Sequence, residues 1–104
     1  MREEHDLLGT LMLPDERYYG IQTLRAKENF AVSTTTAVDI PHYLWSIAAI
    51  KKSAAIANAQ IGILDTEIAQ AIIQATDEVM AHQFDEEFPI DIFQGGGGTS
   101  TNMN

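Results

Sequence analysis

The sequence contains no cysteine and few basic residues. Without cysteine among its 104 residues, the chain has no disulfides, no thiolate zinc sites and no thiol nucleophile. Six Lys and Arg stand against fifteen Asp and Glu, which gives a formal net charge of −9. A chain this acidic repels phosphate backbones and anionic membrane surfaces. We therefore expect neither nucleic acid nor a membrane among its partners.

Long hydrophobic runs are also absent. The longest apolar runs fall far short of the roughly 20 residues that a membrane-spanning helix needs. The first six residues are acidic and contain no apolar h-region, so they do not read as a signal peptide. Together with the lack of cysteine, these features predict a cytoplasmic protein. Hydrophobic residues still make up 45% of the chain, which is normal for a folded globular protein.

The first 39 residues are expected to form an extended, turn-rich segment. Several leucines cluster around Gly9, and Pro14-Asp15 is typical of a turn. This pattern predicts a short β-hairpin or an irregular extended start. The polar, β-branched residues 33–36 predict a loop.

Residues 40–83 carry two helical patterns. The first helix is expected over residues 41–60, because Pro41 suits a first helical turn, Asp39 is a start signal and Gly62 is a natural stop. The apolar face expected for this helix has helical spacing and consists of Tyr43, Ile47, Ile50, Ala54, Ala57 and Ile61.

The second helix is expected over residues 66–82, with Asp65 as its N-cap. Its expected stripe consists of Ile68, Ile72, Ala75 and Val79. The short connection predicts an antiparallel helical hairpin. Each stripe has only one partner within the chain, which indicates further helical partners in the same protein.

Residues 84–104 contain the segment that carries chemistry. An acidic loop and a short apolar, extended stretch precede four consecutive glycines and Thr-Ser-Thr-Asn. Glycines allow positive φ and expose backbone N–H groups, which form anion-binding nests. The hydroxyls of Thr99, Ser100 and Thr101 and the amide of Asn102 add neutral donors that suit a carboxylate or phosphate. Composition alone also permits a flexible linker. A nucleotide P-loop is disfavoured because no lysine follows the glycines.

The other polar residues give weaker signals. His5, His42 and His82 are isolated and show no metal-ligand spacing, so no metal site is predicted. Arg25 is a candidate anion clamp, with an ordinary surface ion pair as the alternative.

Residues 88–104 closely resemble the aspartase segment Q-G-G-(A/G)-G-T-S-x-N-M-N. Residues 6–10, 18–26 and 50–58 resemble other parts of the same family in the expected order. The chain is therefore similar to members of the aspartase/fumarase superfamily. Class II fumarases usually carry Trp-Gly-Ala-Gln-Thr early and Ser-Gly-Thr before N-M-N. Tyr19 and Gly97 at those places favour aspartase, whereas Gln22 is fumarase-like.

This resemblance implies a mainly α fold in which residues 1–104 are an N-terminal domain, followed by central and C-terminal domains. It implies a homotetramer whose active sites combine loops from three subunits. The implied reaction is reversible elimination of ammonia from L-aspartate to give fumarate, without an organic cofactor. Thr99 matches the family's substrate-binding threonine, Ser100 and Asn102 shape the same loop, and Arg25 matches an arginine tied to substrate affinity or site structure. The general-base serine lies beyond Asn104, so the 104 residues alone are expected to be inactive. A helical-hairpin interaction module with a flexible glycine tail is the competing interpretation.

Overall fold

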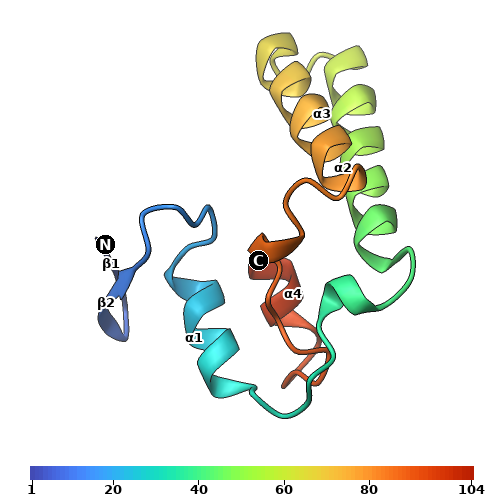
Figure 1. The fold of residues 1–104 in the computed structure, drawn as a ribbon. Coiled ribbons are helices and arrows are strands. Elements are labelled where there is room, and N and C mark those ends of the chain that lie inside the picture. Colours follow the sequence, from blue (N-terminus) through green and yellow to red (C-terminus); the bar gives the residue numbers. More distant parts are fainter. The chain divides into compact units, whose positions relative to one another are not determined.

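The computed structural model describes residues 1–104 and divides them into two compact units. Unit 1 comprises Met1–Asp39 and Glu86–Asn104, and unit 2 comprises Ile40–Asp85. The elements follow the chain (Figure 1) as strands β1 (Arg2–Asp6) and β2 (Gly9–Leu13) and helices α1 (Ile21–Asn29), α2 (Tyr43–Gln60), α3 (Thr66–Met80) and α4 (Thr99–Met103). Two short 3-10 helices cover Ala37–Asp39 and Asp85–Glu87. The expected mainly helical fold class is confirmed.

The N-terminal β-hairpin of unit 1 is confirmed. β1 and β2 pair antiparallel, from Arg2 opposite Leu13 to Asp6 opposite Gly9. The chain reverses over Leu7 and Leu8, and Gly9 adopts φ +121°, a region that side chains rarely tolerate. The Asp6 carboxylate also accepts a hydrogen bond from Leu8 N at 2.9 Å, which closes the turn.

Helix α1 was not predicted, because residues 1–39 were expected to be extended and turn-rich. Gly20 precedes the helix and provides no side-chain cap. The cap comes instead from β1, where Glu4 Oε1 accepts a hydrogen bond from Ile21 N at 2.8 Å. This acceptor satisfies one of the N–H groups that every helix start leaves unpaired. A cap supplied across a fold leaves no local sequence signal.

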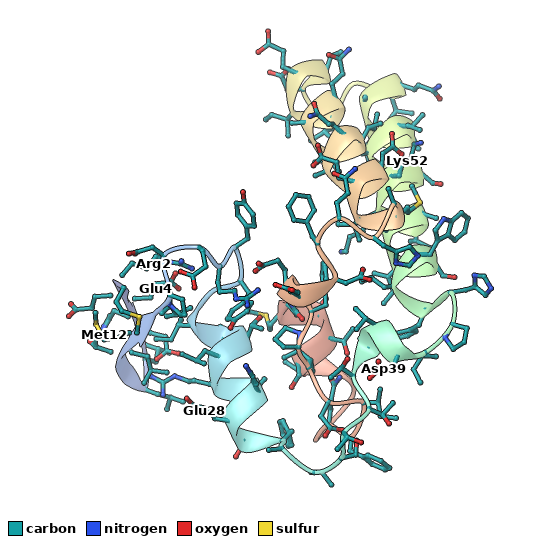
Figure 2. All side chains as sticks on the ribbon, viewed as in Figure 1. Arg2, Glu4, Met12, Glu28, Asp39 and Lys52 are labelled. Carbon is teal, nitrogen blue, oxygen red and sulfur yellow. The ribbon has the colours of Figure 1, made fainter.

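The core of unit 1 gathers Leu13, Tyr19 and Ile21 between the hairpin and α1. Arg2 braces the connecting segment, since its guanidinium donates to the carbonyl oxygens of Pro14, Arg17 and Tyr19 at 2.7–2.8 Å. Arg2 also pairs with Glu4 at 2.8 Å, and both side chains, which belong to β1, are labelled in Figure 2. These contacts hold the hairpin, the connecting segment and α1 together.

Unit 2 is the antiparallel helical hairpin that the sequence predicts (Figure 1). The start of α2 was predicted two residues too early, because His42 has φ +63° and cannot continue a helix backwards to Pro41. Asp39 is not a cap for α2 either, since its carboxylate accepts from Thr36 N at 2.8 Å. The predicted cap of α3 is confirmed, with Asp65 Oδ1 accepting from Glu67 N at 3.0 Å.

The predicted apolar faces of α2 and α3 are only partly buried within this chain: Ile47, Ile72 and Val79 are half-buried. Ile50, Ile61 and Ile68 are 68%, 69% and 53% exposed. The buried residues are instead Leu44, Ala48 and Ala55 of α2 and Ala69 and Thr76 of α3. Small residues allow closer helix approach, and helix α2 is apolar on more than one side, so periodicity did not select the contacting face. No helix combines the length and apolar character needed to cross a membrane.

Candidate functional site

The segment before the glycines is anchored by one buried carboxylate. Asp91 is 5% exposed and forms an isolated antiparallel bridge with Thr36. Its Oδ2 accepts from Val32 N at 3.1 Å and Ser33 N at 2.6 Å, and its Oδ1 accepts from Ser33 Oγ at 3.0 Å and Phe93 N at 2.8 Å. These bonds, led by the one from Phe93 N, lower the pKa of Asp91. Asp91 therefore fixes where the glycine-rich loop, residues 95–98, begins.

Three of the four glycines in the glycine-rich loop are constrained, for different reasons. Gly96 and Gly98 adopt φ +67° and +87°, which confirms the positive φ expected from sequence. A Cβ on Gly95 would lie 3.2 Å from Cζ of Phe30, so this glycine permits close packing on the ring. A Cβ on Gly97 would meet nothing within 4 Å. Among these glycines, only Gly97 combines an ordinary backbone conformation with open space for a side chain.

This difference gives a paired prediction for the loop. Gly98→Ala is expected to destabilise the protein by about 1–2 kcal/mol, because alanine is strained in the left-handed region. Gly97→Ala is expected to stay within about 0.5 kcal/mol of the parent, as an exposed substitution without strain. Chemical denaturation of the complete subunit that carries these residues measures both. Equal losses from the two variants would contradict the assigned backbone conformations.

Helix α4 begins at Thr99, directly after the glycine-rich loop. The three hydroxyls of its first turn differ in how they are engaged. Thr101 Oγ1 accepts from Gln94 Nε2 at 2.6 Å, so it is used within the fold. Thr99 is exposed and Ser100 is buried, and no residue of the chain hydrogen-bonds either side-chain hydroxyl. These two hydroxyls are available to a ligand.

Helices α1 and α4 lie side by side within unit 1 (Figure 1) and border an open hollow of about 560 Å³, here called the α1–α4 hollow. Its lining is Leu8, Gln22, Arg25, Ala26, Glu28, Asn29, Phe30, Thr99, Ser100 and Met103. Three of the four site residues singled out in the sequence, Arg25, Thr99 and Ser100, therefore lie around one hollow. Asn102 is exposed and lies outside the lining.

Arg25 is already engaged in an ion pair. Its Nε and Nη2 donate to the two carboxylate oxygens of Asp6 at 2.8 and 3.0 Å, and Nη2 also donates to Gly9 O at 3.2 Å. The two side chains are only 23% and 11% exposed. The bidentate pair lowers the pKa of Asp6, with the Arg25 bonds as the largest cause. Arg25 thus ties α1 to the turn of the hairpin at the edge of the α1–α4 hollow.

The Asp6–Arg25 pair predicts a specific pH dependence. Because the folded-state pKa of Asp6 lies below its ordinary value of 3.8, the pair stabilises the fold above that value. The stabilisation is lost as pH falls through the lower folded-state pKa. Asp6→Asn is therefore expected to lower Tm by several degrees at neutral pH, and the difference from the parent should shrink toward pH 3. Thermal melts of the complete subunit across this range measure it, and a difference that grows on acidification would refute the pairing.

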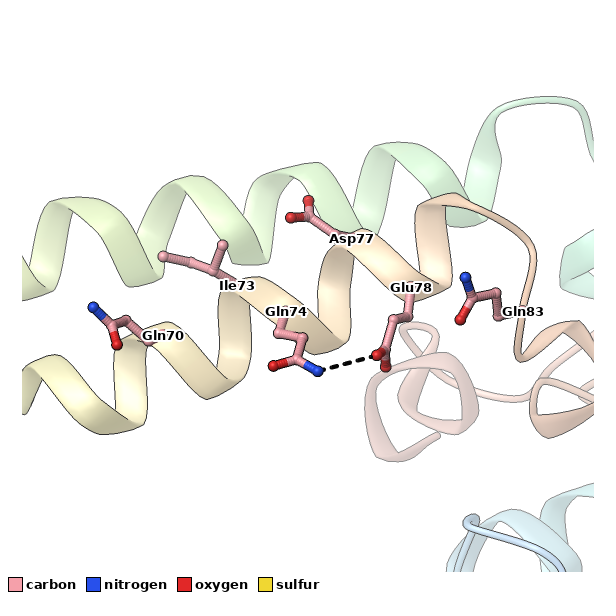
Figure 3. A pocket seen from close by; sticks show the side chains of 6 residues that line it. All are labelled: Gln70, Ile73, Gln74, Asp77, Glu78 and Gln83. Carbon is pink, nitrogen blue, oxygen red and sulfur yellow. Dashed lines mark hydrogen bonds between the residues drawn. The ribbon is translucent and has the colours of Figure 1, made fainter.

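A second hollow of about 370 Å³ lies on α3 in unit 2 (Figure 3). It is lined by Gln70, Ile73, Gln74, Asp77, Glu78 and Gln83. Gln74 Nε2 donates to Glu78 Oε1 at 3.3 Å across one helical turn. The lining contains two carboxylates, of which Asp77 is paired with Lys52 at 2.7 Å, so Glu78 leaves the hollow with a negative charge that disfavours an anionic ligand. The chain also contains no group of three or more acidic or histidine side chains placed to hold a metal ion.

Sequence reasoning missed two residues of the α1–α4 region. Asp6 pairs with Arg25 across 19 positions, and Gln94 bonds Thr101 across the glycine-rich loop. Asp6 and Gln94 both fall within the stretches that carry the family resemblance, which was the only available signal for them. Their roles depend on contacts that composition and spacing do not reveal.

Comparison with known proteins then places the chain in a family. The family model described as "Lyase" matches residues 9–104. The chain belongs to this lyase family. The aspartate ammonia-lyase of Helicobacter pylori strain J99 is 47% identical over 104 residues, and that of Escherichia coli K12 is 46% identical over 105 residues. Each match covers all of this chain and 22% of the relative, so the chain spans less than a quarter of the length of these curated relatives.

Solved structures show the same fold in other lyases. The fumarate lyase:delta crystallin of Brucella melitensis superposes with a TM-score of 0.90 at 43% identity, covering 99% of this chain and 23% of that one. The class II fumarase of Schistosoma mansoni superposes with a TM-score of 0.86 at 42% identity, covering 97% and 21%. The expected resemblance to the aspartase/fumarase superfamily is therefore confirmed.

Proposed function

We propose that this chain is the N-terminal domain of an aspartate ammonia-lyase, which reversibly eliminates ammonia from L-aspartate to give fumarate. The observation that carries the proposal is the α1–α4 hollow, where the available hydroxyls of Thr99 and Ser100 lie at the end of a glycine-rich loop. Within the domain, residues 1–39 and 84–104 supply this site, and residues 40–83 supply a helical hairpin. The curated relatives at 45–47% identity bear the same name.

The chemistry of such a lyase fits neutral donors at this place. Removal of a Cβ proton beside a carboxylate places a second negative charge on that carboxylate. Preorganised O–H and N–H donors stabilise this charge without reorganising during the reaction. We assign Thr99 as the first donor, with Ser100 shaping the same turn. Asn102 is exposed at α4 and is assigned to the substrate-binding loop on family resemblance alone.

The charges around the α1–α4 hollow support a site completed by other segments. Arg25 is neutralised by Asp6, and Glu28 adds a negative charge to the lining. The hollow alone therefore does not attract a dianion, and a dicarboxylate requires further cationic groups. This requirement agrees with an active site built from several subunits of a homotetramer. On family resemblance alone, we also propose that the protein is cytoplasmic and uses no organic cofactor. The 104 residues alone should therefore produce no fumarate from L-aspartate.

A class II fumarase is the second candidate. Gln22 matches the fumarase pattern and lines the α1–α4 hollow. Gly97 stands where fumarases usually carry serine, and a Cβ there meets nothing within 4 Å, so the fold accommodates either residue. Glycine at this unconstrained position therefore favours the ammonia-lyase. Tyr19 stands where fumarases usually carry tryptophan. Because Tyr19 is a core residue, this difference reflects packing and does not help to choose between the two substrates.

The test is fumarate formation by the complete subunit that carries these residues, followed by ultraviolet absorbance. L-aspartate and L-malate are supplied in separate reactions, and the purified 104-residue chain serves as the fragment control. We expect turnover of L-aspartate alone, by the complete subunit alone. Turnover of L-malate alone would replace the proposal with the fumarase, and turnover by the fragment would refute the need for further segments.

A further inference from the structure

Gln94 closes the glycine-rich loop with both ends of its carboxamide. Its Oε1 accepts from Thr101 N at 3.0 Å, and its Nε2 donates to Thr101 Oγ1 at 2.6 Å. Nε2 also donates to the carbonyl oxygen of Asp91 at 3.1 Å. The side chain is partly buried, and its three bonds use both polar atoms of the amide. The residues on either side of the four glycines are thus joined directly.

The hydrogen bond from Thr101 N to Gln94 caps the start of α4. Thr101 is the third residue of the helix, and its N–H is one that a helix start leaves without a partner. A side chain at the N-cap usually accepts it, but the N-cap here is Gly98, which has none. Gln94 supplies that acceptor from the far side of the loop. Two residues therefore share the start of α4: Gly98 adopts the positive φ, and Gln94 accepts the hydrogen bond from Thr101 N.

The same contacts link the loop to the rest of unit 1. Asp91, whose carbonyl oxygen accepts from Gln94, is itself held by its buried carboxylate bonds to residues 32–33. Four successive glycines have large conformational entropy, so the loop needs such an external restraint to keep one geometry. Thr99 stands only two residues before Thr101 in the same turn. Its hydroxyl is therefore placed through Thr101.

We propose that Gln94 is a positioning residue for the lyase reaction, because it fixes the first turn of α4 and thereby the Thr99 hydroxyl. This inference rests on the proposed function of the α1–α4 hollow. Gln94 lies outside the lining of that hollow and both polar atoms of its amide are bonded within the fold, so we assign it a role through Thr101 and Thr99 rather than on the substrate. Displacement of a binding group by about 1 Å is enough to lower catalytic efficiency by about a hundredfold.

The test uses Gln94→Met in the complete subunit, since methionine keeps the length of the side chain and removes all three hydrogen bonds. We expect kcat/KM for L-aspartate to fall about 10- to 100-fold, with faster amide hydrogen exchange confined to residues 94–101. In a Thr99→Ala background, Gln94→Met should cause less than about a threefold further loss, because groups that act as a unit are not additive. A full multiplicative loss in that background would show a merely structural role and overturn the proposal.

Two variants at Thr101 test the same inference if the Gln94→Met subunit does not fold or assemble. Thr101→Val removes the hydroxyl partner of Gln94, whereas Thr101→Ser retains it. We expect Thr101→Val to lower kcat/KM by about 3- to 10-fold, as expected for one lost neutral hydrogen bond, and Thr101→Ser to match the parent. Equal activity of the two variants would overturn the inference. Absence of aspartate turnover in the parent subunit would instead refute the proposed function.

Discussion

Thr99→Ala in the complete subunit should lower kcat/KM for L-aspartate by about 100- to 1,000-fold, the loss typical for removing one donor to a developing oxyanion. The Thr99 hydroxyl is available in the α1–α4 hollow and has no partner within the chain, so its removal leaves no broken bond in the fold. Stability should change by no more than about 0.5 kcal/mol, as is usual at an exposed position. Steady-state kinetics and thermal melts of the same preparations measure the two effects.

Two neighbouring substitutions control this prediction. Thr99→Ser keeps the hydroxyl and should retain activity within about tenfold of the parent, since only the methyl group is lost. Thr99→Val keeps the shape and should be as impaired as alanine. If valine and threonine gave similar rates, the hydroxyl would have no part in binding the substrate, and the assignment of Thr99 would fail.

Asp91→Asn is expected to cause a large structural loss. Both carboxylate oxygens of Asp91 accept hydrogen bonds, two at each oxygen. An asparagine amide turns one oxygen into an N–H donor, which then faces backbone N–H groups of Ser33 or Phe93. Buried donors left without acceptors are costly, so Tm should fall by several degrees and aspartate turnover should fall with it.

Asp85→Asn is the matched control for Asp91→Asn. Asp85 is more exposed, and its carboxylate pairs with the ring Nδ1 of His82 at 3.2 Å. An exposed pair of this kind contributes little to stability, so the control should melt close to the parent. The deficit of Asp91→Asn should also diminish below its ordinary pKa of 3.8, because the folded-state pKa is depressed and the stabilisation is present only above that range. Similar melting of both variants at neutral pH would contradict the anchoring role of Asp91.

Short sequence patterns correctly predicted the elements that are specified by neighbouring residues. The β-hairpin follows from Gly9 and the leucines beside it, and the cap of α3 follows from Asp65. Helix α1 was missed because its cap, Glu4, lies 17 residues earlier in the chain. The most buried residues of α2 and α3 were not identified, because helical spacing gives candidate faces without showing which part of a face meets the partner helix.

Some features of the candidate site were likewise predictable from the sequence, and others were not. The chemistry of Thr99 and Ser100 follows from the glycines and hydroxyls of the segment, and the structure places both residues at one hollow. An ion pair was one of the two roles expected for Arg25, but its partner Asp6 and the restraint by Gln94 were not predictable, because each bond joins residues that only the fold brings together. Sequence thus indicated candidate groups for binding a carboxylate, and the structure adds the residues that contact their loop.

The most direct test of the central claim is a crystal structure of the complete, assembled subunit with fumarate bound. The account predicts a carboxylate of the ligand at the α1–α4 hollow, with Thr99 Oγ1 at hydrogen-bonding distance, about 2.5–3.0 Å, from one of its oxygens. Fumarate bound elsewhere, with the glycine-rich loop and Thr99 out of contact, would contradict it.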